Sequence, residues 1–525
     1  MALNSTLLGV RWDPLRGQIL RAAHRKGRAR FGARPARRSL LAALFGTAAF
    51  LGVVALDTPP GPGLDPDSMS YLGAAESLAR HGALRIPMAD WSDADSTSPL
   101  RHFPPGFPAV LAIPVALGVA PVQAARGVEA VSALATVALA VWLVAAVGGS
   151  WAGALAGVAL LVSPALVLDH ARVLSEPLCL ALLAATLALM VCTKRPLLYG
   201  LTAAAAGLVR YAAVPAGGAA ALWAFGLRGP LRERLRRAAL AALPTALLSA
   251  AVMMRSMLES GTAAAMTLQP HLGATLRELA ATLVAWLAPA VPGGVGAALL
   301  AMGVGGAGVV VLSDAARGGA SRPERPALRS LLSAAALLAG CYAAFVLASR
   351  ALVYDSIPFD DRMLSPVVLV AEVAAAAVLG VCWRAWPRWA RTAAGVAAAL
   401  WLGASAWATA GAVADARDGG WGYASDEWRA SKLGEWLRAD GRGAEIYSND
   451  PAGVWFLTHR PSRELPSADD SASLEALGRI LVGRRAVVVV GFAQEYEPTV
   501  APDSVSRRLG LRLAAAFPEG RVWVK

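Results

Sequence analysis

Long runs of Ala, Leu and Val that are almost free of charged residues recur along this sequence up to about residue 414. A run of about 20 apolar residues is long enough to cross a bilayer as a helix. Only 16% of the residues are charged and 56% are hydrophobic, whereas soluble proteins carry roughly 25% charged residues. The sequence therefore predicts a polytopic α-helical membrane protein.

The apolar runs predict where the membrane spans lie. The stretch 196–226 has Arg210 and Tyr211 in its middle and is long enough for two short helices or a re-entrant hairpin. Counting it as two gives about 11 transmembrane helices. The other predicted spans are 39–56, 122–147, 151–169, 174–193, 238–258, 293–313, 331–349, 363–382 and 392–414.

Positive charge predicts the orientation. Residues 1–38 carry ten Lys or Arg and one acid, Asp13, which is typical of a basic cytoplasmic tail. The net charge of +13 comes from clusters between apolar runs, so it indicates membrane topology and not nucleic-acid binding. With the N-terminus cytoplasmic, the C-terminal part is extracytoplasmic, and the Ala- and Arg-rich composition favours a bacterial inner membrane.

The sequence predicts three domains: the basic tail 1–38, a multi-helix transmembrane domain 39–414, and a small extracytoplasmic α/β domain 415–525. In the last, strands are predicted at 444–450, 486–492 and 521–525, and helices at 427–439 and 471–483. Residues 57–106 form the first outer loop. It contains a short helix, predicted to be capped by Asp67 and to end at Gly82, and a proline-broken interfacial helix after His102.

Several common site types have no signature here. The four cysteines, Cys179, Cys192, Cys341 and Cys382, lie in apolar segments without a Cys-x-x-Cys pair, which favours packing over disulfide or zinc chemistry. No Walker A motif, H-E-x-x-H motif or G-x-S-x-G motif occurs. ATP-driven transport and zinc proteolysis therefore lack their usual motifs.

Two acids in the first outer loop are candidates for catalysis. Asp65 and Asp67 follow the first span at the outer face, shortly before Tyr71. One interpretation is a helix cap and an Asx-turn. The other is a general base at the membrane surface, where an amphiphilic substrate could meet it.

Other polar residues gather at predicted outer positions. Asp169, His170 and Glu176 lie in the run LDHARVLSEPL, which is either a wet turn or a group that orients the base or an acceptor. His102 and Tyr71 are further candidates for orienting the base or an acceptor, although a lone His is more often structural.

Three arginines are candidates for binding a phosphate. Arg210 interrupts an apolar stretch, where it either has a function or extends to the interface. Arg350 and Arg362 flank a short, highly charged outer loop. A guanidinium matches phosphate oxygens in geometry and stays charged, so these arginines suit a phosphate leaving group.

The chain resembles the GT-C membrane glycosyltransferases, a group that includes protein O-mannosyltransferases and the lipid A aminoarabinose transferase. The motifs that carry the resemblance are DPDSMSY, HFPPGFP, RVLSEPL and DDRMLSP, in this order. The resemblance implies inverting transfer of a sugar from a polyprenyl-phosphate donor, with Asp67 as base and Asp65 as the alternate. It also implies that Arg362 faces the lipid phosphate. Several members bind a divalent metal, but no clear ligand set occurs here, so metal dependence stays open.

Two other classes of function remain open on the sequence. A multi-spanning transporter or flippase of lipid-linked sugars would also have many helices and isolated charges. A non-catalytic partner in cell-envelope assembly would tolerate the loss of both Asp65 and Asp67. The acceptor of a transferase could be a glycan, a lipid or a protein hydroxyl.

Overall fold

The computed structural model describes residues 35–56, 61–260, 272–287, 325–352, 360–439, 443–467, 471–482, 484, 486–493 and 499–525. Their contacts divide the chain into two units. The helical unit comprises Met1–Val53, Ala130–His170 and Ser175–Ala412. The α/β unit comprises Val54–Glu129, Ala171–Leu174 and Val413–Lys525.

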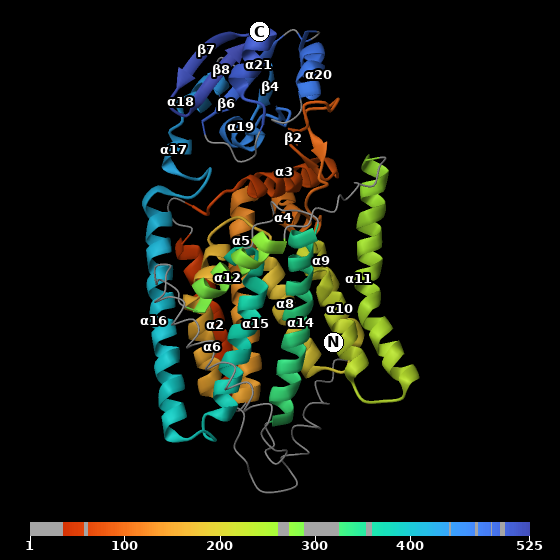
Figure 1. Cartoon of the computed structure of the whole chain (residues 1–525), viewed down its shortest axis with the longest axis vertical. Helices are drawn as coiled ribbons and strands as arrows, with labels where there is room; N and C mark the ends of the chain where they lie inside the picture. The colour runs from red at the N-terminus through yellow and green to blue at the C-terminus, as the bar shows by residue number, and fades with distance from the viewer. Residues whose placement is uncertain are drawn as a thin grey trace, which may run out of the picture. The chain divides into compact units, whose positions relative to one another are not determined.

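The apolar runs fold into helices, and the long ones lie side by side in Figure 1. A single 3₁₀ turn, η1 (Tyr211–Ala213), lies among them. The helices are α2 (Pro35–Leu56), α5 (Pro121–Gly148), α6 (Ser150–Val162), α7 (Pro164–His170), α8 (Glu176–Cys192), α9 (Pro196–Val209), α10 (Pro215–Gly226), α11 (Leu231–Ser260), α12 (Leu272–Leu287), α14 (Arg325–Leu352), α15 (Asp361–Cys382) and α16 (Arg388–Gly419).

Six of the described helices are long and apolar enough to cross a membrane. The bent pair α6–α7 would make a seventh span. The stretch 196–226 forms two short helices, α9 and α10, as one of its two interpretations predicted. A polytopic helical membrane protein is thus confirmed. The count of about 11 spans is not, because α8, α9 and α10 are shorter than a full span and the span predicted at 293–313 lies outside the described residues.

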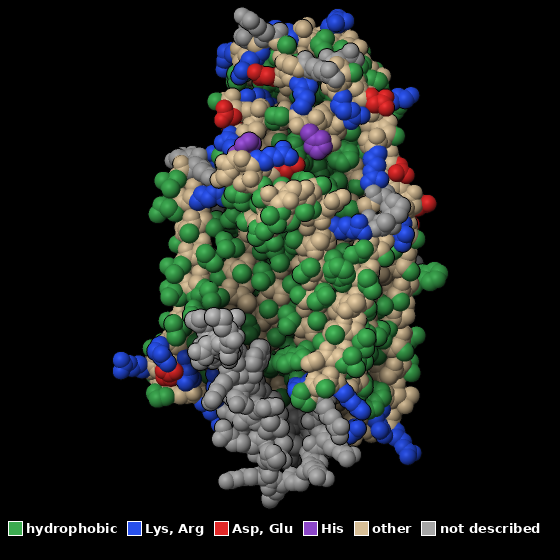
Figure 2. Space-filling view, turned by 180° about the vertical axis from the view of Figure 1, so that it is seen from behind, with side chains coloured by type: hydrophobic (Ala, Val, Ile, Leu, Met, Phe, Trp, Pro, Cys, Tyr) green, Lys and Arg blue, Asp and Glu red, His purple; other side chains and the backbone are tan. Residues whose placement is uncertain are grey.

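The helical unit presents apolar side chains on its surface. Leu44, Leu400 and Trp407 are 58%, 61% and 78% exposed, and hydrophobic side chains cover most of the helical face in Figure 2. A soluble protein rarely exposes so large an apolar patch. This surface fits contact with lipid acyl chains.

Small residues let α15 approach the corner between α5 and α6. A Cβ atom placed on Gly380 of α15 would lie 2.5 Å from the Ala152 Cβ atom and 2.8 Å from the Gly148 carbonyl oxygen. Such close backbone approach is the usual way in which membrane helices pack. It fixes α15, which carries Arg362 in its first turn, against α6.

The α/β unit contains a mixed sheet of six strands in the order β2-β5-β4-β6-β8-β7. β2, β5, β4 and β6 are parallel to one another, β8 pairs antiparallel with β6, and β7 pairs antiparallel with β8. A separate antiparallel pair joins β1 (Arg85–Ile86) and β3 (Ser98–Pro99). The strands of the sheet are β2 (Met88–Ala89), β4 (Glu445–Ser448), β5 (Ser462–Glu464), β6 (Val487–Phe492), β7 (Arg512–Phe517) and β8 (Gly520–Val524).

Helices pack on this sheet and on the first outer loop. On one face, Leu477 and Leu481 of α20 bury Tyr447 and Val489. The helices of the unit are α3 (Pro66–His81), α4 (Gly106–Ala116), α17 (Asp426–Arg429), α18 (Lys432–Ala439), α19 (Pro451–Thr458), α20 (Ser471–Val482) and α21 (Pro502–Leu509). α4 has 11 residues, which is too short for a span.

The first outer loop supplies the edge strand of the C-terminal sheet. Met88 of β2 pairs in parallel with Ser462 of β5. The buried Arg463 also donates hydrogen bonds from its guanidinium to the carbonyl oxygens of Asp93 and Ala94. The loop and the C-terminal residues therefore form one folded unit.

A buried carboxyl group makes the stability of this unit depend on pH. Asp450 is 4% exposed, and its Oδ1 atom accepts hydrogen bonds from the Tyr423 hydroxyl and the Gly453 N–H. Burial raises the pKa of Asp450 to about 6, although these hydrogen bonds oppose the rise. A raised carboxyl pKa gives stability that is present below the unfolded pKa of about 4 and is lost as pH rises through 6.

We therefore expect Asp450→Asn to gain stability over the wild type as pH rises from 4 to 8, by up to about 3 kcal/mol. Melting temperatures of the purified full-length protein across this range measure the gap. Asp426→Asn, at an exposed aspartate of α17, is the matched control and should show no such trend. A difference in melting temperature between Asp450→Asn and the wild type that stays constant with pH would contradict a raised pKa of Asp450.

Candidate active site

The first polar cluster lies at the start of α3, in the α/β unit. Pro66 takes the first helical position, so Asp65 is the N-cap and its N–H donates to the Ser68 Oγ atom at 2.9 Å. The prediction of Asp67 as the cap was wrong, because proline favours the first position of a helix and shifts the cap to the preceding residue. Asp67 lies in the first turn of α3. The predicted end at Gly82 is confirmed.

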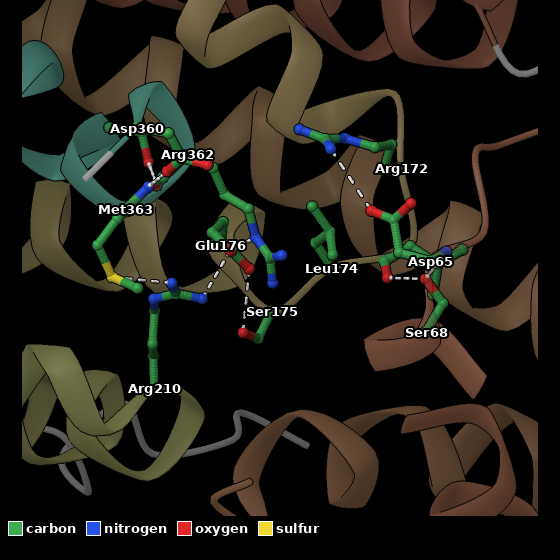
Figure 3. A network of polar contacts seen from close by, with 12 residues as sticks. Asp65, Ser68, Arg172, Leu174, Ser175, Glu176, Arg210, Asp360, Arg362 and Met363 are labelled. Carbon is green, nitrogen blue, oxygen red and sulfur yellow. Dashed lines mark hydrogen bonds and ion pairs between the residues drawn. The ribbon is translucent and has the colours of Figure 1, made fainter. Parts of the chain in front are cut away.

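The Asp65 carboxylate is held by an arginine. The Arg172 Nη1 atom lies 3.4 Å from the Asp65 Oδ2 atom, and both side chains are about one fifth exposed (Figure 3). The Arg172 guanidinium also lies over the Trp421 ring, 4.7 Å from its centre. These contacts restrict the Asp65 carboxylate to one position.

Beside Asp65, the backbones of three segments that are distant in the sequence form hydrogen bonds with one another. The Gly63 N–H donates to the Ala171 carbonyl and the Val173 N–H donates to the Gly63 carbonyl, both at 2.9 Å. A Cβ atom on Gly63 would lie 2.7 Å from the Arg172 Cγ atom, so glycine is needed there. On its other side, Leu64 pairs with Gly422. The residues before α3 are thus fixed by residues 171–173 and 421–423.

The second polar cluster lies in the helical unit and is centred on Glu176, the first residue of α8. Its side chain is 1% exposed. The Arg210 Nη1 atom lies 2.6 Å from its Oε1 atom, and the Arg362 Nε atom donates a hydrogen bond to the same oxygen (Figure 3). Its Oε2 atom accepts from the Ser175 hydroxyl at 3.2 Å. The structure thus brings together three residues that the sequence singled out separately.

The local structure explains how the two arginines reach Glu176. Arg210 is the extended residue between α9 and the 3₁₀ turn, and Arg362 lies in the first turn of α15. The Arg210 Nη2 atom also contacts the Met363 sulfur at 3.2 Å. Their side chains are 11% and 22% exposed.

The charges of this cluster suit an anion. Two guanidinium groups face one carboxylate, which leaves one positive charge in excess among the three. Each guanidinium has further N–H donors beyond those that Glu176 takes. Glu176 orients the arginines, and the planar guanidinium group matches the oxygens of a phosphate in geometry.

Arg350 belongs to a different ion pair. It lies in the last turn of α14 and donates two hydrogen bonds to Glu278 of α12, at 2.6 and 3.2 Å. Neither α12 nor the role of Glu278 was predicted from the sequence. The sequence pattern that could have revealed α12 is amphipathic: Leu272, Leu276 and Leu283 recur at helical spacing, and all three are exposed on one side of the helix.

Two predicted site residues at the end of α7 are buried. Asp169 is 1% exposed and His170 is 6% exposed. The His170 Nδ1 atom lies 2.6 Å from the Leu166 carbonyl oxygen, which fixes the ring within its own helix. Both belong to the helical unit.

Two predicted residues of the first outer loop lie in aromatic contacts. Tyr71 is 1% exposed, and its ring lies 4.8 and 5.1 Å from those of Phe103 and Phe107. The exposed His102 packs edge-on against Phe103. This environment suits a packing role for Tyr71 better than contact with an acceptor.

A metal site has no support in the part of the chain that the structure describes. No group of three or more His, Cys, Asp or Glu side chains there is arranged to hold a metal ion.

Solved structures share the fold of this chain. A scan against protein-family models and a search of curated proteins each found no match. ArnT from Cupriavidus metallidurans, solved with bound undecaprenyl phosphate, matches at 14% identity over 92% of this chain and 97% of its own, with a TM-score of 0.58. The oligosaccharyltransferase AglB from Archaeoglobus fulgidus, solved with an inhibitory peptide and a dolichol-phosphate, matches at 12% identity. It covers 85% of this chain and 69% of its own, with a TM-score of 0.52.

At these identities the likeness establishes the fold. The chain has the fold of the GT-C membrane glycosyltransferases, and the resemblance predicted from its four short motifs is confirmed at that level.

Proposed function

We propose that this protein is a membrane glycosyltransferase that moves a sugar from a polyprenyl-phosphate donor to a hydroxyl group of a glycan, lipid or protein. One observation carries the proposal. It is the buried cluster in which Glu176 holds Arg210 and Arg362, in a chain with the GT-C fold. The ArnT structure of the same fold holds undecaprenyl phosphate, which is the kind of lipid carrier that the proposed donor would release.

The two arginines take the donor phosphate in this proposal. The phosphate becomes more negative as the bond to the sugar breaks, and fixed guanidinium groups stabilise that charge without having to reorganise. Glu176 is a positioning residue, because its carboxylate already binds Arg210, Arg362 and Ser175. Arg350 is the weakest of the three phosphate candidates, because Glu278 already binds it.

Asp67 is the proposed general base. It accepts the proton of the acceptor hydroxyl while the hydroxyl oxygen forms a bond to the anomeric carbon. The bond from that carbon to the phosphate oxygen breaks, and polyprenyl phosphate leaves with the electron pair, so the configuration inverts. Asp65 is the alternate base, but its pairing with Arg172 supports a positioning role.

The proposed orientation follows the distribution of basic residues. The N-terminal tail is cytoplasmic, the chain crosses the bacterial inner membrane about 11 times when short helices are counted, and the α/β unit is extracytoplasmic. An extracytoplasmic site suits a lipid-linked donor, since nucleotide sugars are scarce there.

A donor panel tests the function. Membranes from cells that express the protein receive radiolabelled polyprenyl-phosphate sugars, one donor at a time, and transfer to endogenous acceptors is measured. We expect one donor to be consumed above the level of cells with the empty vector. Consumption of none, with the protein present and folded, would contradict the proposal.

A further inference from the structure

A buried acid in α15 has no role in the proposed reaction. Glu372 is 8% exposed and lies well inside the 22-residue span α15. Both of its carboxylate oxygens are buried, and among the described residues only the Ser163 hydroxyl lies near them, outside the geometry of a good hydrogen bond. An unpaired carboxylate within a membrane costs several kcal/mol, so such a residue usually marks a binding site.

Glu372 lies beside the break between α6 and α7. α15 packs against both helices, and Ser163, the residue between them, is the polar side chain next to the carboxylate. Ser163 is 1% exposed and has an extended ψ of 113°. The axes of α6 and α7 differ by 61° there.

The break between α6 and α7 leaves a backbone carbonyl oxygen without its helical hydrogen-bond donor. Pro164 has no N–H, so it cannot donate to the carbonyl of Leu160 as the next helical residue would. This carbonyl belongs to the last turn of α6, which carries the negative end of the helix dipole. The Val162 carbonyl already accepts from the Thr409 hydroxyl of α16 at 2.8 Å, so the break is held open by a third helix.

We propose that Glu372, the Ser163 hydroxyl and the α6–α7 break form a site for a dehydrated monovalent cation such as sodium. Backbone carbonyls at a broken helix, such as that of Leu160 here, coordinate sodium in membrane transporters. A carboxylate and a hydroxyl add oxygen ligands of the kind that hard cations take. One carboxylate balances one positive charge. A divalent ion would need more acids, and no group of three His, Cys, Asp or Glu occurs among the described residues.

The site would stiffen two elements that carry candidate active-site residues. α7 ends with Asp169 and His170, and α15 carries Arg362 in its first turn. The cation would join α15 to the break at the start of α7. It is a structural ion in this proposal and takes no part in the transfer reaction.

Equilibrium binding of radioactive sodium to the full-length protein in nanodiscs tests the site, with choline chloride as the background salt. We expect saturable binding of one ion per chain in the wild type. The isosteric variant Glu372→Gln should raise the half-saturating sodium concentration at least tenfold, and Ser163→Ala should raise it less. Glu233→Gln, at a surface acid of α11, should bind as the wild type does. Equal binding by the wild type and Glu372→Gln, or no saturable binding by the wild type, would overturn the proposal.

Melting temperature gives a second readout that does not depend on the tracer. Replacing choline chloride with sodium chloride at constant ionic strength should raise the melting temperature of the wild type and leave that of Glu372→Gln unchanged. If the melting temperature of the wild type responds to falling pH and not to sodium, Glu372 holds a proton and the cation site is wrong. Neither assay requires the protein to transfer a sugar, so both remain valid if the proposed enzymatic function fails.

Discussion

Replacing Asp67 by asparagine should lower the rate of sugar transfer by about 10²–10⁴-fold, the usual contribution of a general base. Asparagine keeps the shape of the side chain but cannot accept the proton of the acceptor hydroxyl. Asp67 lies in the first turn of α3, where a lost negative charge costs only about 0.3–1 kcal/mol of stability. Transfer rates in membranes, normalised to the amount of folded protein, measure the effect.

Two further variants serve as controls for Asp67→Asn. Asp95→Asn changes an exposed aspartate of the same outer loop, paired with Arg85 at 3.2 Å, and should leave the rate nearly unchanged. Asp65→Asn removes the charge that Arg172 holds and should cost less activity than Asp67→Asn. If Asp65→Asn lowers the transfer rate more than Asp67→Asn does, Asp65 is the base and Asp67 only stabilises the first turn of α3.

Replacing Glu176 by glutamine should destabilise the protein by about 3–5 kcal/mol, the typical cost of removing one partner from a buried ion pair. The variant leaves the guanidinium groups of Arg210 and Arg362 without their shared carboxylate in a site where little water can replace it. Because the same arginines are proposed to bind the donor phosphate, the half-saturating donor concentration should rise as well. Melting temperature and transfer at varied donor concentration report the two effects separately.

The chain offers a matched control for this variant at its surface. Glu233 of α11 also bridges two arginines, with Nε atoms of Arg236 and Arg237 each 2.9 Å from its carboxylate. The Glu233 side chain is 31% exposed, against 1% for Glu176, and solvent screens such surface pairs. Glu233→Gln should leave both the melting temperature and the transfer rate nearly unchanged. If Glu176→Gln behaves in the same way, Glu176 does not hold the arginines as the structure indicates.

The membrane helices were predictable where an apolar run is long and uninterrupted. α5 and α15 begin and end within a few residues of the predicted spans at 122–147 and 363–382. α12 was missed because Arg277 and Glu278 interrupt its apolar residues, so no run of span length occurs. Only the fold reveals that its polar side faces Arg350.

The members of the candidate site were predictable, but their pairing was not. Glu176, Arg210 and Arg362 were each singled out as ionisable groups in or beside apolar segments. They are separated by up to 186 residues along the chain, and no local pattern says which carboxylate meets which guanidinium. Glu372 was passed over, although a single acid in the middle of an apolar run is itself a signal.

That the first outer loop contributes a strand to the C-terminal sheet could not be predicted from the sequence either. β2 consists of Met88 and Ala89 only, and so short a strand has no alternating pattern that could be recognised. It is defined by its partner β5, which lies more than 370 residues later.

In the proposed reaction, sugar leaves a polyprenyl-phosphate donor on this chain and is joined to an acceptor. Purified protein in nanodiscs, supplied with the donor identified in the panel and its acceptor, provides the most direct measurement. We expect one polyprenyl phosphate to be released for each sugar transferred, and no release without acceptor. Intact donor that moves across proteoliposome membranes, without release of polyprenyl phosphate, would contradict the claim and identify a transporter.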